Sequence, residues 1–195
     1  MDMTLAIDPG IRHTGYAVAG PIGHTTTGLR EFGLLLTSRT WPDVDRICCL
    51  MARLKQVCLV YEVDHVLVED FQIFGRARVT KGYMRSAKLQ GAVHVLPIIT
   101  LADLSVYRPA EWQTSFVKKL GLRVKRDKKE AIQRRLMHRL NVDLTDHETD
   151  AIGILLNHLY NAKGVARVLA RRDWIRNVVP AKDLKLTPSF SGEDS

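Results

Sequence analysis

The order of apolar segments along the chain is the sequence feature that most constrains its fold. Three short apolar runs, over 5–8, 14–19 and 28–37, are each closed by glycine or polar residues. Such runs predict two or three antiparallel strands joined by tight turns. Over 43–61 the apolar residues instead recur every three or four positions, which indicates an amphipathic helix.

Strands and helices alternate in the rest of the chain. We expect strands over 65–68 and 104–107. The helices that we expect cover 83–100, a segment that starts at Pro109, 126–140 and 146–161. The order β-β-β-α-β-α-β-α predicts a single α/β domain in which a mixed sheet is covered by helices.

The chain contains no segment that reads as a linker, so we assign residues 1–162 to one domain. A basic, weakly amphipathic helix over 163–179 is expected to pack on this domain or to extend it. The polar segment 180–195 is expected to form a mobile tail, because the ends of a chain are often poorly ordered.

Composition is that of an ordinary soluble globular protein. The 195 residues are 46% hydrophobic and 26% charged, and no apolar run reaches the roughly 18 residues that a membrane-spanning helix needs. The N-terminus lacks a basic region followed by an apolar stretch, so we expect no signal peptide. Three cysteines, Cys48, Cys49 and Cys58, fall in one short segment. Their odd number predicts no disulfide framework and a reducing, cytoplasmic location.

The charge balance is the first indication of function. Lysine and arginine number 29 against 21 aspartate and glutamate residues, a formal net charge of +8. Ten of the basic residues, with only two acidic ones, fall within 118–139. A second zone, 71–102, holds five basic residues and no acidic one. Two basic zones on a nearly neutral body favour a nucleic-acid partner, with a solvated helix face as the alternative for either zone.

Two acidic residues end two of the expected strands. Asp8 follows the apolar run 5–7, and Glu69 follows 66–68 in the same way. A buried carboxylate is costly unless it is paired or bound to a cation. Adjacent strands lie about 4.8 Å apart, so carboxylates at the ends of two neighbouring parallel strands can share one cation.

A third acidic segment, 145–150, opens the last expected helix. Thr145 and Glu148 fit a capping box, which explains Glu148 without a function. Asp146 also has a structural explanation, because acidic residues in the first turn interact favourably with the helix dipole. These acids alone therefore predict a helix start and no more.

Asp150 is harder to explain by structure alone, because it lies one turn into an apolar stretch. Residues three and four apart share a helix face, so Asp150 shares one with His147 or with Asp146. Together with Asp8 and Glu69, these residues form a set of hard ligands that suits Mg²⁺ or Mn²⁺. Beside a basic surface, such a set predicts two-metal phosphodiester hydrolysis.

Four motifs resemble those of one family, the RuvC-type Holliday junction resolvases of the ribonuclease H-like superfamily. Residues 6–18 resemble the first-strand motif of that family, and 66–69 resemble its second acidic motif. Residues 86–92 resemble the helix that follows. Residues 147–153 resemble the last motif, which carries two metal ligands three residues apart. The resemblance covers most of the chain, in the right order and at about the right spacing.

The resemblance implies a ribonuclease H-like fold with a mixed five-stranded sheet flanked by helices. It also implies a homodimeric, Mg²⁺-dependent endonuclease that nicks two opposed strands of a four-way junction. The implied metal site consists of Asp8, Glu69, His147 and Asp150. Many family members have an aspartate in place of His147, and because imidazole is a softer ligand than carboxylate, this difference favours Mn²⁺.

The segment after Glu69 is expected to contact DNA. The family places an aromatic residue here against junction bases, so Phe71 or Phe74 is expected to stack on DNA, with core packing as the alternative. The sequence identifies no helicase partner. The expected phosphate contacts are the basic residues of the two zones: Arg76, Arg78, Lys81, Arg85, Lys88, Lys118, Lys119, Lys125, Arg126, Lys128 and Lys129.

Other functions are compatible with the same residues. One is a different ribonuclease H-like nuclease, acting on RNA–DNA hybrids or on flap or branched DNA. Another is a catalytically idle DNA-binding protein on this fold, although the four potential ligands argue against it. Half of an actin-like kinase is excluded, because such enzymes need two domains. Oligomeric state separates the nucleases, because cutting two strands symmetrically requires a dimer.

Overall fold

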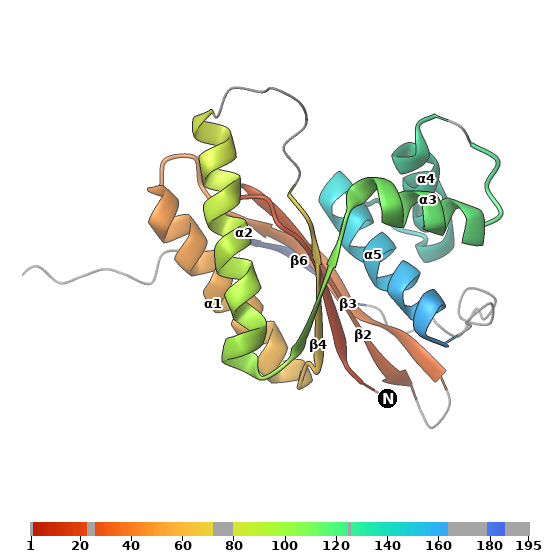
Figure 1. Cartoon of the computed structure of the whole chain (residues 1–195), viewed down its shortest axis with the longest axis horizontal. Helices are drawn as coiled ribbons and strands as arrows, with labels where there is room; N and C mark the ends of the chain where they lie inside the picture. The colour runs from red at the N-terminus through yellow and green to blue at the C-terminus, as the bar shows by residue number, and fades with distance from the viewer. Residues whose placement is uncertain (1, 23–25, 72–79, 125, 164–178, 186–195) are drawn as a thin grey trace, which may run out of the picture.

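A central sheet lies between two layers of helices in the computed structural model, which describes residues 2–22, 26–71, 80–124, 126–163 and 179–185 (Figure 1). The strands are β1 (Thr4–Asp8), β2 (His13–Ile22), β3 (Thr26–Leu36), β4 (His65–Glu69), β5 (Asp103–Tyr107) and β6 (Val179–Lys185). The helices are α1 (Asp43–Tyr61), α2 (Lys81–Thr100), α3 (Pro109–Lys119), α4 (Lys128–Leu140) and α5 (Asp146–Lys163).

The sheet is mixed, with the strand order β5-β4-β1-β2-β3-β6. Strand β2 is antiparallel to both of its neighbours, β1 and β3, whereas β1, β4 and β5 run parallel to one another. The five strands that the sequence predicts are therefore all present. The expected α/β fold, a mixed sheet flanked by helices, is confirmed.

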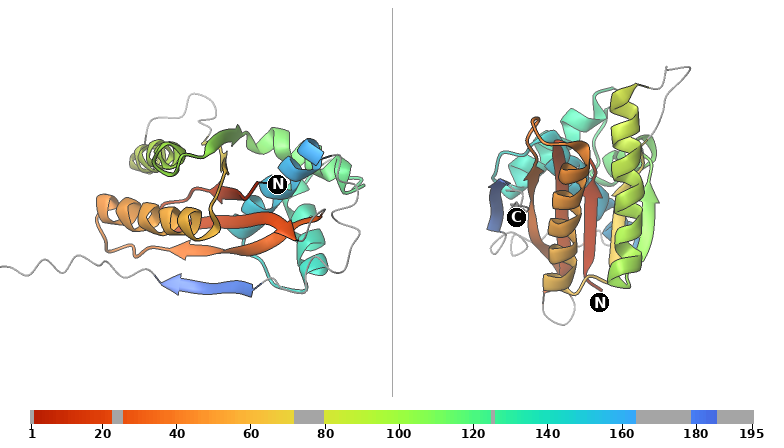
Figure 2. Two further views of the ribbon diagram at one scale, coloured as in Figure 1. Left: turned by 90° about the horizontal axis from the view of Figure 1, so that it is seen from below. Right: turned by 90° about the vertical axis from the view of Figure 1, so that its left-hand side faces the viewer.

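Alternation of side chains along β1 divides the core between the two helical layers. Leu5 and Ile7 pack with residues of α1 and α2 on one face of the sheet. Ala6 packs with residues of α3, α4 and α5 on the other face. The small Ala6 and Ala17 let the second layer approach the sheet closely, and both are fully buried. Figures 1 and 2 show α1 and α2 running side by side on the face opposite α5.

One glycine on β2 determines how closely α5 approaches the sheet. A Cβ atom at Gly15 would overlap with the main-chain carbonyl group of His147, at the start of α5. Any side chain at this position would therefore push the first turn of α5 away from β1 and β2. Since Gly15 pairs with Asp8 across the strands, the close approach brings the first turn of α5 next to the end of β1.

A sixth strand, β6, begins at Val179 and includes the first residues of the segment 180–195 that the sequence predicts as a tail. It pairs in parallel with β3, with Glu31 opposite Val179 and Leu36 opposite Lys185 (Figure 2). An edge strand presents unpaired main-chain groups, and any extended segment can satisfy them. The polar composition of the segment hides this pairing. The expected helix over 163–179 lies almost wholly outside the described residues.

The cysteines and the apolar character of the helices can also be compared with what composition predicts. Cys48, Cys49 and Cys58 are all free, in agreement with the expected lack of a disulfide framework. Among the helices that the structure describes, none is long and apolar enough to cross a membrane.

Candidate metal centre and nucleic-acid interface

The first two acidic residues of the site come from the carboxyl ends of adjacent parallel strands. Ile7 of β1 pairs with Val68 of β4, so the next residues, Asp8 and Glu69, end the two strands side by side. Asp8 is 7% exposed. The parallel register therefore holds two acidic side chains at one edge of the sheet, as the sequence predicts.

The third acidic residue comes from α5, whose start is fixed by a capping box. The main-chain N–H of Thr145 donates to Glu148 Oε2 at 2.9 Å, and the N–H of Glu148 donates to Thr145 Oγ1 at 3.3 Å. Glu148 is thereby used as a cap. Asp150, one turn further along, is 4% exposed and faces the strand ends.

Asp8, Glu69 and Asp150 form one group, which we call the carboxylate cluster. Each contributes an oxygen, and these oxygens all lie within 4.8 Å of one another. Burial, together with the charges of Asp8 and Asp150, raises the pKa of Glu69 to about 9. Burial likewise raises the pKa of Asp150 to about 6, against the opposing effect of Lys129. When carboxylates lie this close together and are shielded from water, it is unfavourable for all of them to carry a negative charge. A cation bound between them would offset this repulsion.

His147 contacts the cluster through Asp8. Its Nδ1 atom lies 2.5 Å from Asp8 Oδ2, and this hydrogen bond raises the pKa of the imidazole although burial opposes the shift. The neighbouring Asp146 has a side chain that is 66% exposed. The structure thus brings His147, rather than Asp146, against the end of β1.

Lys129 of α4 is a cationic neighbour of the cluster. Its Nζ atom lies 2.6 Å from Asp150 Oδ2 and 3.5 Å from Asp146 Oδ2. Burial lowers the pKa of this ammonium group, but the hydrogen bond to Asp150 and the charges of the nearby carboxylates together outweigh burial, and the pKa is raised. The sequence predicts Lys129 as a phosphate contact, and its position also makes it a partner of an acidic site residue.

Glu69 has two neighbours on opposite layers of the fold. The indole N–H of Trp112, in α3, donates to Glu69 Oε1 at 2.8 Å. From α2, the Gln90 side-chain amide donates to the Glu69 main-chain carbonyl at 3.1 Å and lies 2.9 Å from His94 Nε2. Nothing in the local sequence links Trp112 to a residue 43 positions earlier, so this contact is not predictable from the sequence.

The carboxylate cluster fits a divalent metal ion. Three carboxylate groups, those of Asp8 and Asp150 buried and that of Glu69 half-buried, are hard oxygen ligands of the kind that Mg²⁺ and Mn²⁺ prefer. Asp150 Oδ1 is buried and has no hydrogen-bond partner among the described residues. A buried acceptor without a partner is costly, and a bound cation would satisfy it.

Among the described basic residues of the two zones, some side chains are exposed to solvent and others contact acidic or polar residues of the protein. On α2, Lys81 and Lys88 are exposed, whereas the guanidinium group of Arg85 forms a 2.8 Å ion pair with Asp43 of α1. Arg126 is exposed just before α4. The predicted contacts Phe74, Arg76, Arg78 and Lys125 lie outside the described residues.

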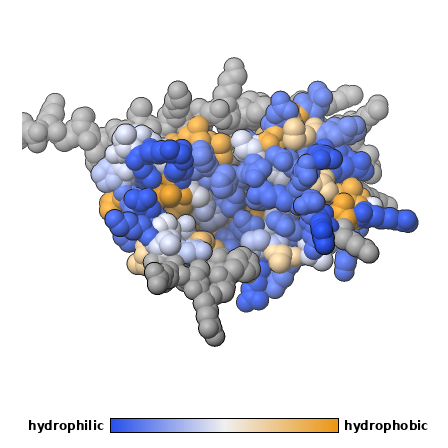
Figure 3. Space-filling view, turned by 90° about the horizontal axis from the view of Figure 1, so that it is seen from above, coloured by the Kyte–Doolittle hydropathy of each residue, from blue (hydrophilic) through white to orange (hydrophobic). Residues whose placement is uncertain are grey.

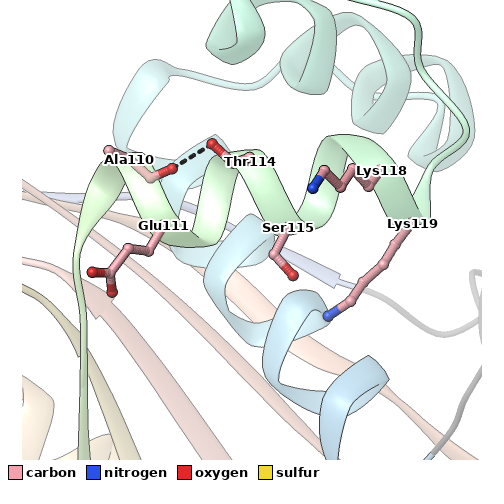
Figure 4. A pocket seen from close by; sticks show the side chains of 6 residues that line it. All are labelled: Ala110, Glu111, Thr114, Ser115, Lys118 and Lys119. Carbon is pink, nitrogen blue, oxygen red and sulfur yellow. Dashed lines mark hydrogen bonds between the residues drawn. The ribbon is translucent and has the colours of Figure 1, made fainter.

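An open hollow of about 600 Å³ runs along α3 and includes the two lysines at its end, Lys118 and Lys119 (Figure 4). Lys119 extends toward α5, where its ammonium group contacts Asn157 O at 3.1 Å, Asn157 Oδ1 at 2.8 Å and Asn161 Oδ1 at 2.6 Å. These contacts favour a role for Lys119 in joining α3 to α5. Lys118 is exposed. Lys128 of α4 donates to Thr114 Oγ1 at 2.9 Å.

Phe71 lies two residues after Glu69 and is half-buried. Its ring centroid is 5.8 Å from that of Tyr83, at the start of α2. The surface beside the strand ends, seen from above in Figure 3, is mostly hydrophilic with a few apolar patches. Partial exposure is compatible both with stacking on DNA and with packing on Tyr83, so both interpretations of Phe71 stand.

The sheet order and the three carboxylates define a class of protein. A mixed sheet of this strand order, with acidic residues at the ends of β1 and β4 and on the first turns of α5, is a ribonuclease H-like arrangement. A family model, "Crossover junction endodeoxyribonuclease RuvC", matches residues 4–158. The chain therefore belongs to the RuvC family of crossover junction endodeoxyribonucleases.

Curated relatives carry the same family name. The RuvC of Anaplasma marginale (strain Florida) is 23% identical over 167 residues, covering 83% of this chain and 95% of the relative. The RuvC of Trichlorobacter lovleyi is 29% identical over 159 residues, covering 80% of this chain and 83% of the relative.

Solved structures agree on the fold. Thermus thermophilus RuvC in complex with a Holliday junction substrate has a TM-score of 0.65 and 23% identity, covering 84% of this chain and 96% of that chain. The yeast mitochondrial Holliday junction resolvase Ydc2 has a TM-score of 0.57 and 14% identity, covering 88% of this chain and 82% of that one. These likenesses support the ribonuclease H-like fold.

Proposed function

We propose that this chain is a divalent-metal-dependent endodeoxyribonuclease that resolves four-way DNA junctions, working as a homodimer that makes paired nicks. The carboxylate cluster is the observation that carries the proposal, because it gathers three acids, two of them buried, from β1, β4 and α5 in a member of the RuvC family. The expected substrate is the one named for the Thermus thermophilus relative, a Holliday junction.

Asp8, Glu69 and Asp150 would hold the metal, with His147 as the fourth expected ligand. Two such ions would supply the activation of a water molecule and the stabilisation of the leaving oxygen of a phosphodiester. His147 orients Asp8 through its hydrogen bond, and Lys129 orients Asp150 in the same way. Burial keeps bulk water from the carboxylates, which strengthens their interaction with any cation.

Outside the cluster, exposed basic residues would bind the phosphates of the DNA arms. Lys81 and Lys88 on α2, Lys118 on α3 and Arg126 before α4 are exposed. Contacts to phosphates fix the position and register of DNA without reading its sequence. We therefore expect affinity for junctions to survive the loss of a metal-site carboxylate.

A homodimer is proposed because two opposed DNA strands must be cut. The surface best suited to form the dimer interface is an apolar one. Of the large apolar side chains that are exposed in the described residues, most lie on α2, on β5 or between them. Leu101, which follows α2, is 94% exposed. Exposed apolar patches mark partner sites. The surface consists of Met84, Val95, Ile98, Ile99, Leu101, Leu104 and Val106.

Analytical ultracentrifugation of Ile98→Glu tests this dimer surface. We expect the wild type to sediment as a dimer and Ile98→Glu as a monomer with an unchanged circular dichroism spectrum. Val44→Glu, at a similarly exposed position at the start of α1, is the matched control and should remain dimeric. A dimeric Ile98→Glu would move the interface elsewhere, and a monomeric wild type would contradict paired cutting.

Cleavage of a labelled four-way junction tests the proposed activity. The wild type is compared on junction, flap, linear duplex and RNA–DNA hybrid, with Mg²⁺, with Mn²⁺ and with EDTA. We expect two symmetric nicks in the junction, only when metal is present. Faster cutting of hybrid or flap would replace the resolvase by another ribonuclease H-like nuclease, and binding without any cleavage would favour an idle DNA-binding protein.

A further inference from the structure

Trp112 is a buried residue with a polar contact that connects it to the carboxylate cluster. It is 1% exposed, and its Nε1–H group donates to Glu69 Oε1 at 2.8 Å. The indole N–H is a donor only, and a buried tryptophan normally directs it to a partner. Here the partner is the cluster residue that ends β4, so this side chain connects α3 to the carboxylate cluster.

The hydrogen bond restricts how the Glu69 carboxylate can rotate. A glutamate has three side-chain torsions, and rotation about the last one is broad unless something holds it. Donation to Oε1 fixes that oxygen on the side of α3. A carboxylate has two oxygens, so Glu69 can accept from Trp112 and also offer a ligand atom to a cation shared with Asp8 and Asp150, because one oxygen of each of the three lies within 4.8 Å of the others.

A glycine on α5 provides the space that the indole ring needs. A Cβ atom at Gly153 would lie 2.6 Å from Trp112 Cζ3 and 2.8 Å from Cη2. Real Cβ atoms do not come so close to other atoms, so a side chain here would displace the ring. Gly153 follows Asp150 by three residues, and the same helix face therefore carries a cluster carboxylate and the space for the indole.

We propose that Trp112 is a positioning residue for the metal site, in which the indole N–H, seated against Gly153, holds Glu69 in the orientation that binds a divalent cation. This inference rests on the proposed metal-dependent function. It adds a role for a residue of α3 that neither the acidic motifs nor the family membership assigns. Mutation of a residue that hydrogen-bonds to a metal ligand and orients it typically weakens metal affinity by about 10–100-fold.

The alternative is that Trp112 only fills the core. It packs with Phe116 at a ring-centroid distance of 6.4 Å and belongs to the cluster of apolar residues around α5. The two roles differ in what they require of the side chain. Packing requires an aromatic ring of about this size, whereas positioning requires the N–H donor.

Trp112→Phe separates these roles, because it keeps an aromatic ring and removes the donor. Mn²⁺ binding is measured by isothermal titration calorimetry on the intact chain without DNA. We expect the dissociation constant to rise by about 10-fold or more relative to wild type. Phe116→Leu is the matched control, since it alters the same core without touching Glu69, and its Mn²⁺ affinity should match the wild type.

A double variant shows whether Trp112 acts through Glu69. In a Glu69→Gln background, the further change Trp112→Phe should leave Mn²⁺ affinity nearly unchanged, because the positioned carboxylate is already gone. An equal loss in both backgrounds would overturn the inference. So would wild-type affinity in Trp112→Phe, which would leave the proposed metal site intact. A folded wild type that binds no Mn²⁺ would overturn the proposed function as well.

Fluorescence provides a test that does not depend on how well the Trp112 variants fold. Replacing Trp41 and Trp174 by Phe leaves Trp112 as the only tryptophan of the chain. Mn²⁺ is paramagnetic and quenches a nearby indole, so its addition should reduce the emission over the same concentration range as calorimetric binding. Unchanged emission at saturating Mn²⁺ would place the ion away from Trp112 and overturn the inference.

Discussion

The replacement Glu69→Gln is expected to make the metal-free protein more stable near and above neutral pH, although it removes an expected ligand. In the wild type, burial and the charges of Asp8 and Asp150 raise the pKa of Glu69 to about 9. The folded state therefore keeps a proton that the unfolded chain, with the ordinary glutamate pKa of 4.5, has released. Glutamine has no charge to bury and keeps an oxygen that can accept from Trp112.

The magnitude follows from the number of protons bound. Stability changes by about 1.4 kcal/mol per pH unit for each proton that one state binds in excess. Between the ordinary pKa of 4.5 and the raised pKa of about 9, folded Glu69 binds more protons than unfolded Glu69. Its contribution is fully present at low pH and is lost as pH rises toward 9. From pH 6 to pH 8 the wild type should lose up to about 3 kcal/mol from this group.

Urea unfolding at pH 6, 7 and 8 in EDTA measures this difference as the free energy of unfolding. The stability advantage of Glu69→Gln over wild type should widen with pH by up to about 3 kcal/mol. Asp70→Asn, which removes the next carboxylate along the chain, is the control and should follow the wild type. Saturating Mn²⁺ should reverse the order, because ligand binding stabilises the state that binds it. Equal pH slopes for Glu69→Gln and wild type would refute the reasoning.

Three other experiments test the remaining parts of the site. Asp150→Asn should reduce cleavage by more than about 100-fold, since it removes a ligand rather than a supporting contact. Gel shifts should show unchanged junction binding, and retained cleavage would remove Asp150 from the metal site. At fixed Mn²⁺, His147→Ala should cripple cleavage and Asp146→Ala should leave most of it, and the opposite result would reassign the ligand. Replacing Lys118 and Arg126 by Ala should lower the log–log salt slope of duplex binding by about 0.9 for each phosphate that these side chains neutralise, measured by fluorescence anisotropy; an unchanged slope would place both on a solvated face.

The strand ends and the helix start of the site are predictable because short-range patterns determine them. Asp8 and Glu69 each follow an apolar run, and the parallel pairing of β1 with β4 brings those ends together. The capping box over Thr145 and Glu148 marks the first turn of α5, so the inward position of Asp150 follows from helix periodicity. The ligand roles themselves stay predictions until metal binding is measured.

Interactions between distant segments are what the sequence does not reveal. Trp112 reaches Glu69 only because Gly153 leaves room for its ring, and these three residues come from separate elements. Lys119 belongs to the same basic run as Lys118, yet its charge is directed to asparagines of α5. The total charge of a basic run can be counted from the sequence, whereas tertiary packing determines which of its side chains face inward.

The direction of β6 matters for the design of optical experiments. Strand β6 runs parallel to β3, and Leu36, at the end of β3, pairs both with Lys185 and with His13, which follows the turn after β1. Position 185 therefore lies at the same end of the strands as Asp8, whereas Thr4 lies at the opposite end. A donor fluorophore attached at position 185 would report energy transfer to acceptor-labelled junction DNA near the cutting edge, and one attached near position 4 would serve as the distant reference.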